Sequence, residues 1–355
     1  MPRTARSLPI YSGAPVDTLQ RPLRDVRLSV TDRCNFRCSY CMPAEIFGPD
    51  FAFLPRAELL TFEELALVAR ELVALGARTL RITGGEPLVR RDLEQLVALL
   101  RALDASEALS GEPLDIALTT NGSLLAKLAA PLRAAGLNRI TVSLDSLSPA
   151  TFTRMSGSAL PLESVLEGIA AATAAGFSGI KLNAVIRRGV NDADVPALAT
   201  FAREGGHTLR LIEYMDVGSS NGWRLDEVVP ASEILAQLHA RYPLEALAPS
   251  RPGEVANRYR SLAGGGEIGL IASVSAPFCG DCTRARVSAD GQLYTCLFAS
   301  EGSDLKRYLR PVLDAAALRD ALHARWSVRD DRYSEIRDAE TANRLPKVEM
   351  FRVGG

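Results

Sequence analysis

The first residues in the chain whose types and spacing suggest chemistry are three cysteines near its beginning. Cys34, Cys38 and Cys41, here called the first cysteine set, lie within eight residues of sequence. Three thiolates on one short loop can hold three irons of a four-iron cluster and leave the fourth iron without a protein ligand. A reactive metal site keeps such a position open, whereas a structural site closes its coordination shell. The first cysteine set therefore predicts an iron–sulfur cluster that can bind a further molecule.

The other three cysteines, Cys279, Cys282 and Cys296, form a second cysteine set. Two groups of three with no cysteine left over favour two metal centres, each short of one protein ligand. Zinc is an alternative for the first cysteine set, but it would need a distant fourth ligand. A further alternative is that the first cysteine set consists of three ordinary buried thiols, but the polar residues between its cysteines disfavour this.

The elements that must position these cysteines alternate between strands and helices. The first cysteine set follows a predicted strand at 25–31, which alternates and is rich in valine and leucine. Further strands are expected at 79–83, 115–120, 139–145, 180–186 and 208–214, and helices at 61–75, 92–103, 124–135, 163–175 and 194–203. This alternation with short loops indicates a parallel sheet covered by helices. Six such units predict a partial (β/α)6 barrel of the TIM type.

One face of several predicted strands is polar, although the interior of an ordinary parallel barrel is filled with Val, Ile and Leu. The residues that share this face are Arg27, Ser29 and Thr31, Arg81 and Thr83, Thr141, Ser143 and Asp145, and Lys181 and Asn183. Side chains alternate between the two faces of a strand, so the opposite face can pack on the helices. We therefore expect a polar lumen that holds a ligand. The alternative, a solvent-facing sheet edge, suits a helix-covered sheet poorly.

Beyond the last predicted unit the pattern changes, and we divide the chain into three regions. Residues 1–22 are expected to form a flexible leader, 23–220 the barrel, and 221–355 a C-terminal extension that carries the second cysteine set and ends in Gly-Gly. Within this last region we expect helices at 231–239 and 318–325 and hairpins at 258–273 and 286–295.

Composition narrows the function classes. The chain has 355 residues, of which 47% are hydrophobic, and a formal net charge of −1, so a basic surface for nucleic acid is not expected. No signal peptide and no apolar run of about 18 residues is evident, so we expect no membrane association. A cytoplasmic location follows as an expectation, and cysteines there serve more often as metal ligands or reactive groups than in disulfides.

The ordered set of motifs resembles the GTP 3′,8-cyclase family of the radical S-adenosylmethionine (SAM) superfamily. The resemblance runs from about residue 23 to the last residue. The motifs that carry it are the first cysteine set, Gly84-Gly85-Glu86-Pro87, Thr119-Thr120-Asn121-Gly122, Met215-Asp216-Val217-Gly218, Asn221-Gly222-Trp223, the second cysteine set with Arg284 and Arg286, and the Gly354-Gly355 end.

The resemblance implies an enzyme, a lyase that converts GTP to (8S)-3′,8-cyclo-7,8-dihydroguanosine 5′-triphosphate, the first step of molybdenum cofactor biosynthesis. It implies two [4Fe–4S] clusters and SAM as cofactors, with a 5′-deoxyadenosyl radical as the agent that removes the ribose 3′ hydrogen. By resemblance, SAM contacts Tyr40, Gly85, Ser143 and Met215. By resemblance, GTP contacts Arg27, Arg81, Thr119, Lys181, Arg284, Ala285 and Arg286. No residue is assigned as an acid or base.

The resemblance also implies partners. They are a flavodoxin- or ferredoxin-like electron donor, a downstream cyclic pyranopterin monophosphate synthase, and a second copy of the chain in a homodimer. The family further implies that the Gly354-Gly355 tail reaches into the active site, where backbone without side chains can thread a narrow lumen. Two alternatives stay open at this point: another radical SAM enzyme such as a peptide maturase, and an iron–sulfur electron carrier or metal sensor.

Overall fold

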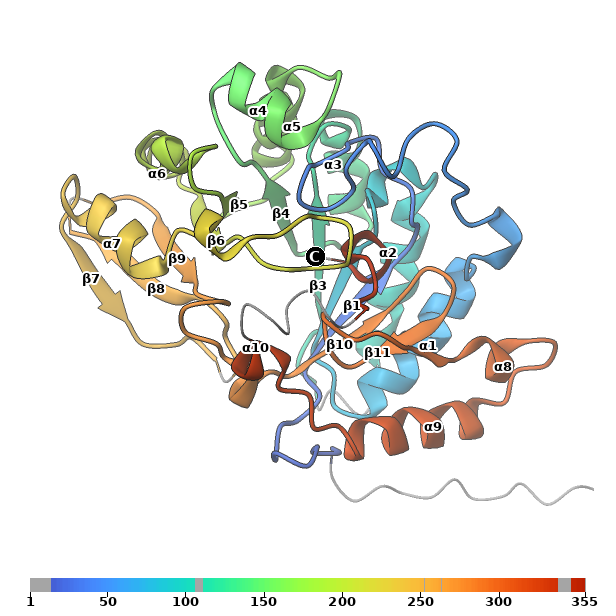
Figure 1. The fold of residues 1–355 in the computed structure, drawn as a ribbon. Coiled ribbons are helices and arrows are strands. Elements are labelled where there is room, and N and C mark those ends of the chain that lie inside the picture. Colours follow the sequence, from blue (N-terminus) through green and yellow to red (C-terminus); the bar gives the residue numbers. More distant parts are fainter. Residues whose placement is uncertain (1–13, 106–110, 252, 263, 338–345, 355) are drawn as a thin grey trace, which may run out of the picture.

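A computed structural model of the chain describes residues 14–105, 111–251, 253–262, 264–337 and 346–354 (Figure 1). The strands of this part of the chain form one twelve-stranded sheet in the order β12-β11-β10-β1-β2-β3-β4-β5-β6-β9-β8-β7. Its middle contains the six predicted strands, paired in parallel and in chain order: β1 (Asp25–Ser29), β2 (Thr79–Thr83), β3 (Asp115–Thr120), β4 (Arg139–Ser143), β5 (Lys181–Ile186) and β6 (Thr208–Glu213). The predicted partial (β/α)6 barrel is therefore confirmed.

Helices cover the outer face of this curved sheet, and the C-terminal end of the described chain lies inside it (Figure 1). They are α1 (Phe62–Ala74), α2 (Leu93–Arg101), α3 (Leu125–Ala134), α4 (Pro149–Ser156), α5 (Leu162–Ala174) and α6 (Val195–Glu204). The start of α1 shows why the sequence predicts it: Thr61 Oγ1 accepts from the Glu64 backbone, and Glu64 Oε2 accepts from the Thr61 backbone. This reciprocal capping satisfies two backbone donors that the helix cannot satisfy internally. Helix α4 is not among the predicted elements.

The C-terminal region adds strands to both edges of the barrel. Its elements are α7 (Ala231–His239), β7 (Leu244–Leu247), β8 (Asn257–Ser261), β9 (Glu267–Ile271), β10 (Arg284–Val287), β11 (Gln292–Tyr294), β12 (Ser303–Asp304), α8 (Lys306–Leu309), α9 (Ala315–Ser327), α10 (Tyr333–Ile336) and α11 (Met350–Val353). The hairpins β8–β9 and β10–β11 confirm the two predicted ones. Strand β9 pairs in parallel with β6, and β10 pairs in parallel with β1, so both hairpins continue the sheet. The second cysteine set is thereby placed beside the first strand of the barrel.

The predicted flexible leader differs from the structure in its second half. Residues 1–13 lie outside the described residues. From residue 14 onward the chain packs against the protein, and the side chains of Asp17 and Arg21 are both buried. The prediction of flexibility is therefore wrong for residues 14–22, because a charged, proline-containing segment can be held by buried ion pairs that its own sequence does not reveal. No helix within the described ranges is both long and apolar enough to cross a membrane.

Candidate active site in the barrel lumen

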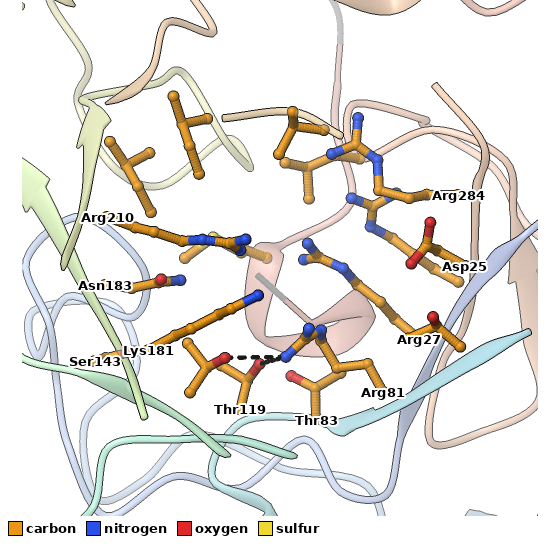
Figure 2. Close-up of a pocket in the computed structure, with 18 of the residues that line it drawn as sticks. Asp25, Arg27, Arg81, Thr83, Thr119, Ser143, Lys181, Asn183, Arg210 and Arg284 are labelled. Carbon is orange, nitrogen blue, oxygen red and sulfur yellow. Dashed lines mark hydrogen bonds between the residues drawn. The ribbon is translucent and has the colours of Figure 1, made fainter. Parts of the chain in front are cut away.

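The lumen contains a cavity of about 700 Å³ that is lined by all six cysteines. This volume lies in the range of cavities that bind small molecules and cofactors. The cavity also collects side chains from the inner face of the strands, which Figure 2 shows pointing toward one another around the lumen. The predicted polar lumen is therefore present.

The first cysteine set follows β1 and lines this cavity with all three side chains partly exposed and free of disulfides. Burial, together with the nearby Glu86 carboxylate, raises the pKa of the Cys34 thiol to about 12. Burial and the neighbouring thiols likewise raise the pKa of Cys38. Thiolates at such positions need positive charge beside them. A metal cluster would supply that charge, so these residues fit the role of cluster ligands.

The second cysteine set surrounds the β10–β11 hairpin, with Cys279 in the turn before β10 and Cys296 just after β11. Arg284 donates from Nη2 to Cys282 Sγ at 3.1 Å. Burial alone would raise the pKa of Cys282, but the charges of Arg284 and Arg329 outweigh it and lower this pKa to about 6. Across the described residues, no three His, Cys, Asp or Glu side chains lie close enough together to hold a single metal ion.

The glycines after β2 are required by the packing of the chain. Gly84 has φ +147°, and a Cβ on Gly85 would lie 2.3 Å from the Arg33 carbonyl oxygen. Backbone bonds from Gly85 to Thr31 O, at 2.9 Å, and from Glu86 to Arg33 O, at 2.8 Å, hold this loop against the start of the first cysteine loop. The Gly-Gly-Glu-Pro loop therefore helps to position the first cysteine set.

Glu86 at the end of that loop is a buried acceptor. Its carboxylate accepts from Thr120 Oγ1 at 2.7 Å and from the backbone amides of Asn121 and Leu88 at 2.7 and 3.0 Å. Burial raises the pKa of Glu86 to about 7 in spite of these bonds. The Thr-Thr-Asn-Gly motif is thus tied to the Gly-Gly-Glu-Pro motif through one side chain.

The four residues expected to contact SAM, Tyr40, Gly85, Ser143 and Met215, all line the cavity. Tyr40 donates its hydroxyl to Asp145 Oδ2 at 2.8 Å, and the Val185 amide donates to the other carboxylate oxygen at 2.9 Å. Burial raises the pKa of Asp145 to about 6. The tyrosine ring is therefore fixed in the cavity wall next to the first cysteine set.

A ring of cations occupies the inner face of the strands (Figure 2). Strand pairing explains it, because Arg27 of β1 lies opposite Arg81 of β2 on one side and opposite Arg286 of β10 on the other. Paired residues in a parallel sheet point to the same face. The members of this cation ring that line the cavity are Arg27, Arg81, Arg139, Lys181, Arg210, Arg284 and Arg286.

Members of the cation ring lie close enough to lower one another's pKa, although the hydrogen bond and charge of Asp115 outweigh burial and raise the pKa of Arg139. Burial, then the charges of Arg210, Arg139 and Arg81, lower the pKa of Lys181 to about 7. Burial and neighbouring arginines also lower the pKa of Arg81 to about 10 and that of Arg27 well below its usual value. Cations that depress one another's pKa in a cavity form a site for a polyanion.

Some polar groups in the cavity wall form hydrogen bonds with each other, and others have no hydrogen-bond partner within the described protein. Arg81 Nη1 donates to Thr119 Oγ1 at 3.1 Å and to Thr141 Oγ1 at 3.2 Å. In contrast, Asn183 Oδ1, Arg286 Nε and Ser273 Oγ are buried without a hydrogen-bond partner in the described protein. Buried polar groups are normally satisfied, so a polar ligand fits this wall.

Of the residues expected to contact GTP, six line the cavity, and Ala285 does not. The Ala285 side chain is 1% exposed and packs in the hydrophobic core, since it points to the opposite face of β10 from its two arginine neighbours. A contact of Ala285 with GTP stays a prediction, and it would have to be made by the backbone, because the side chain is in the core. Sequence reasoning missed Arg210, although the alternation of β6 places it on the inner face by the same rule as Lys181. Sequence reasoning also missed Arg251. This residue lies on a loop, where no periodic pattern could predict its ion pair with Asp25 at 3.0 Å.

The end of the chain enters the lumen. Arg27 Nη1 donates to the Gly354 carbonyl oxygen at 3.1 Å. A Cβ on Gly354, whose φ is +73°, would lie 2.1 Å from Thr83 Cγ2. The expectation that the tail reaches the active site is met by Gly354, and Gly355 lies outside the described residues.

Comparisons with known proteins agree with this geometry. The model of the Radical SAM superfamily matches residues 28–202, and that of Molybdenum Cofactor Synthesis C matches residues 207–335. The chain is 55% identical to the GTP 3′,8-cyclase of Acidothermus cellulolyticus, covering 96% of this chain and 98% of that protein. It is 46% identical to the same enzyme of Staphylococcus aureus over 96% of this chain and 98% of that protein.

Among solved structures, Streptococcus suis SuiB bound to S-adenosylmethionine matches with a TM-score of 0.58 and 13% identity, covering 90% of this chain and 68% of that chain. This similarity shows the fold. The relatives of known name, the two family models and the cavity with its cysteines together establish that the chain belongs to the GTP 3′,8-cyclase family of radical SAM enzymes.

Proposed function

We propose that the lumen binds SAM beside the first cysteine set and GTP along the cation ring, and that the chain catalyses the 3′,8-cyclisation of GTP for molybdenum cofactor biosynthesis. The observation that carries this proposal is one cavity lined by both cysteine sets and by the cation ring. An electron carrier would have no use for such a cation ring. A peptide substrate would carry no triphosphate to match it.

In this proposal each cysteine set holds three irons of a [4Fe–4S] cluster. SAM and a reduced cluster, when bound, supply the radical that removes a hydrogen from the ribose of GTP. The protein contributes the positions of the reactants. Tyr40, Gly85, Ser143 and Met215 would contact SAM, because all four line the cavity wall that includes the first cysteine set.

The cation ring neutralises and orients the triphosphate. Arg81 is held by two threonine hydroxyls before substrate arrives, and Lys181 lies half-buried on the same inner face of the sheet. Guanidinium and ammonium groups bind phosphate oxygens through charge-assisted hydrogen bonds. The GTP site is completed by Arg27, Thr119, Arg284 and Arg286. The guanine ring would lie next to the second cysteine set. Fixed reactants lower the barrier to a ring-forming step, which needs tight geometry.

We also propose the division of the chain into a barrel at 23–220 and a substrate- and cluster-binding region at 221–355. The electron would come from a flavodoxin- or ferredoxin-like protein, and the product would pass to cyclic pyranopterin monophosphate synthase. Six free thiols suit the reducing cytoplasm. A homodimer is the proposed assembly.

The site assignment is tested by calorimetry on the variants Arg81→Ala and Lys181→Ala. Each loses a charge-assisted phosphate contact, which should weaken GTP binding by about 1.5–3 kcal/mol. Guanosine binding should change much less, because guanosine has no phosphate. Arg188→Ala is the matched control, since this cation forms an exposed ion pair with Glu233 outside the cavity. Equal losses of GTP and guanosine binding would contradict a phosphate role.

A further inference from the structure

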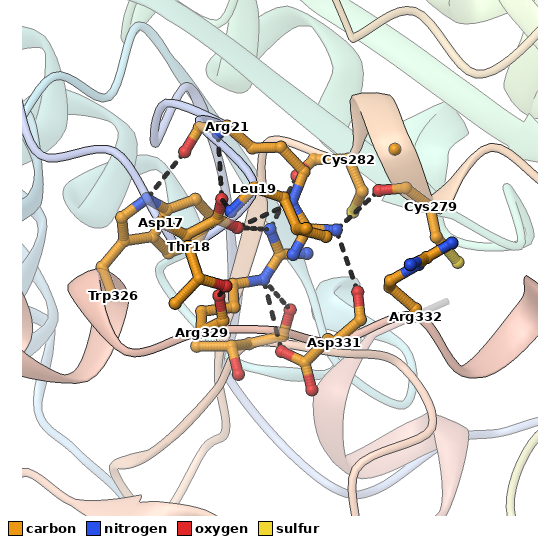
Figure 3. Close-up of polar contacts among 12 residues, drawn as sticks. Asp17, Thr18, Leu19, Arg21, Cys279, Cys282, Trp326, Arg329, Asp331 and Arg332 are labelled. Atoms are coloured by element: carbon orange, nitrogen blue, oxygen red, sulfur yellow. Dashed lines mark hydrogen bonds and ion pairs between the residues drawn. The ribbon is translucent and has the colours of Figure 1, made fainter.

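A buried group of charged side chains supports the second cysteine set from the side of the N-terminal segment (Figure 3). Its members are Asp17, Arg21 and Arg329, which are 2%, 2% and 1% exposed. Asp17 Oδ2 accepts from Arg21 Nε at 2.6 Å and from Arg329 Nη1 at 2.8 Å. One carboxylate thus holds two guanidinium groups side by side. Burying three charges is costly, and their pairing with one another offsets part of that cost.

The two guanidinium groups donate to the backbone of the loops that carry the second cysteine set. Arg21 Nη1 donates to the Cys279 carbonyl oxygen at 2.6 Å. Arg329 donates from Nη1 to the Cys282 carbonyl oxygen at 2.8 Å and from Nε to that of Thr295 at 3.1 Å. Thr295 directly precedes the third cysteine of the set. Each cysteine is therefore held at its own carbonyl or at the carbonyl next to it.

These loops have little regular structure of their own. Cys279 begins a single 3-10 turn of three residues, and the third cysteine lies outside β11 in sequence. A four-iron cluster, however, needs its three sulfur ligands at fixed relative positions. Groups outside the ligand set that orient the ligands commonly supply that order, and their loss weakens metal affinity about 10–100-fold.

The network also joins segments that are far apart in the sequence. Trp326 Nε1 donates to the Arg21 carbonyl oxygen at 3.1 Å, and Thr18 Oγ1 donates to that of Arg329 at 2.8 Å. The N-terminal segment is therefore anchored to the end of α9, and both are anchored to the cysteine loops. This arrangement gives residues 17–21 a role that the sequence interpretation of a flexible leader does not include.

We propose that Asp17, Arg21 and Arg329 are positioning residues, which hold the second cysteine set in the arrangement that an iron–sulfur cluster needs. This inference rests on the proposed function, because it takes the second cysteine set as cluster ligands. A role confined to general folding is the competing explanation. It predicts that loss of the network destabilises the whole chain without any preference for the second cysteine set.

The test uses a full-length parent protein in which the first cysteine set is replaced by alanine, so that all bound iron belongs to the second cysteine set. After anaerobic reconstitution the parent should hold about four irons per chain. A parent that binds no iron would refute the proposed second cluster itself, before any variant of Asp17, Arg21 or Arg329 is made. Failure of the proposed function can therefore be distinguished from failure of this inference.

In this parent, Asp17→Asn and Arg329→Gln should lose iron to a chelator about 10–100-fold faster. The signal of the reduced cluster in electron paramagnetic resonance should also broaden or shift. Arg329→Lys should show an intermediate loss rate, since an ammonium group keeps the charge but cannot reach three acceptors in the fork geometry of a guanidinium group.

The matched control is Arg101→Gln. Arg101 also donates to two backbone carbonyls, those of Leu114 at 2.9 Å and Gly136 at 2.7 Å, but it does not line the cavity. The control should lower the melting temperature while it leaves iron loss and the cluster signal unchanged. Unchanged iron loss in Asp17→Asn and Arg329→Gln would overturn the inference. So would equally rapid loss in the control, which would indicate a folding effect.

Discussion

Lys181 provides a quantitative test of the cation ring, because its charge should depend on the substrate. Burial, followed by the charges of Arg210, Arg139 and Arg81, lowers the pKa of Lys181 to about 7. At pH 8, one unit higher, about nine-tenths of the free protein would carry a neutral Lys181. A triphosphate beside this amine favours its charged form. GTP binding at pH 8 should therefore take up about 0.9 proton per site.

Titration calorimetry in two buffers of different ionisation enthalpy measures this uptake. Lys181→Met should abolish the uptake at pH 8, and guanosine should cause little uptake even in the unchanged protein. GTP itself is fully ionised at pH 8, so it contributes no proton of its own. The reasoning would be refuted by GTP binding without proton uptake at pH 8, or by an uptake that survives in Lys181→Met.

The same shift has a consequence for the ligand-free protein. The folded-state pKa of Lys181 is lowered to about 7, below its unfolded value, so between the two the unfolded chain binds more protons. The contribution of Lys181 protonation to the free energy of unfolding must then rise with pH between its folded and its unfolded pKa. Lys181→Met should remove that rise, and urea unfolding at pH 6.5 and pH 9 measures the difference.

Three further predictions concern the clusters, the tail and the fold. The triple alanine variant of the first cysteine set should keep about half of roughly eight irons and lose SAM cleavage; unchanged iron content would contradict it. Deleting Gly354 and Gly355 should leave iron content, GTP affinity and SAM cleavage largely intact, while cyclised product per 5′-deoxyadenosine falls sharply in chromatographic assays. An unaltered yield would show that the tail is not needed. Thr61→Ala removes the N-cap of α1 and should lower the free energy of unfolding, measured by urea denaturation, by about 1 kcal/mol. A decrease of less than a few tenths of a kcal/mol would contradict the capping role.

Much of the fold follows from local patterns. The six parallel strands and their helices have strong periodicity, and the Thr61 capping box marks the start of α1 within one residue. The polar inner face could be predicted because side-chain alternation along a strand is independent of the rest of the protein. The same rule would have identified Arg210, had it been applied to β6.

Other features depend on contacts between distant segments, which no local pattern carries. The parallel pairing of β10 with β1 decides that Arg286 lies opposite Arg27, and it turns the Ala285 side chain into the core. The ion pair of Asp17 with Arg329 joins residues 312 positions apart, so the N-terminal segment looked flexible in the sequence. Where the Gly-Gly-Glu-Pro loop packs on the chain before Cys34, the glycines serve the fold as well as any ligand.

The most direct test of the proposed function is the fate of the ribose 3′ hydrogen. Reconstituted protein, dithionite, SAM and GTP deuterated at C3′ are incubated without oxygen, and the 5′-deoxyadenosine formed is analysed by mass spectrometry. The proposed reaction predicts that 5′-deoxyadenosine carries one deuterium and that an isomer of GTP forms in matching amount. 5′-Deoxyadenosine without deuterium, with GTP recovered unchanged, would contradict it.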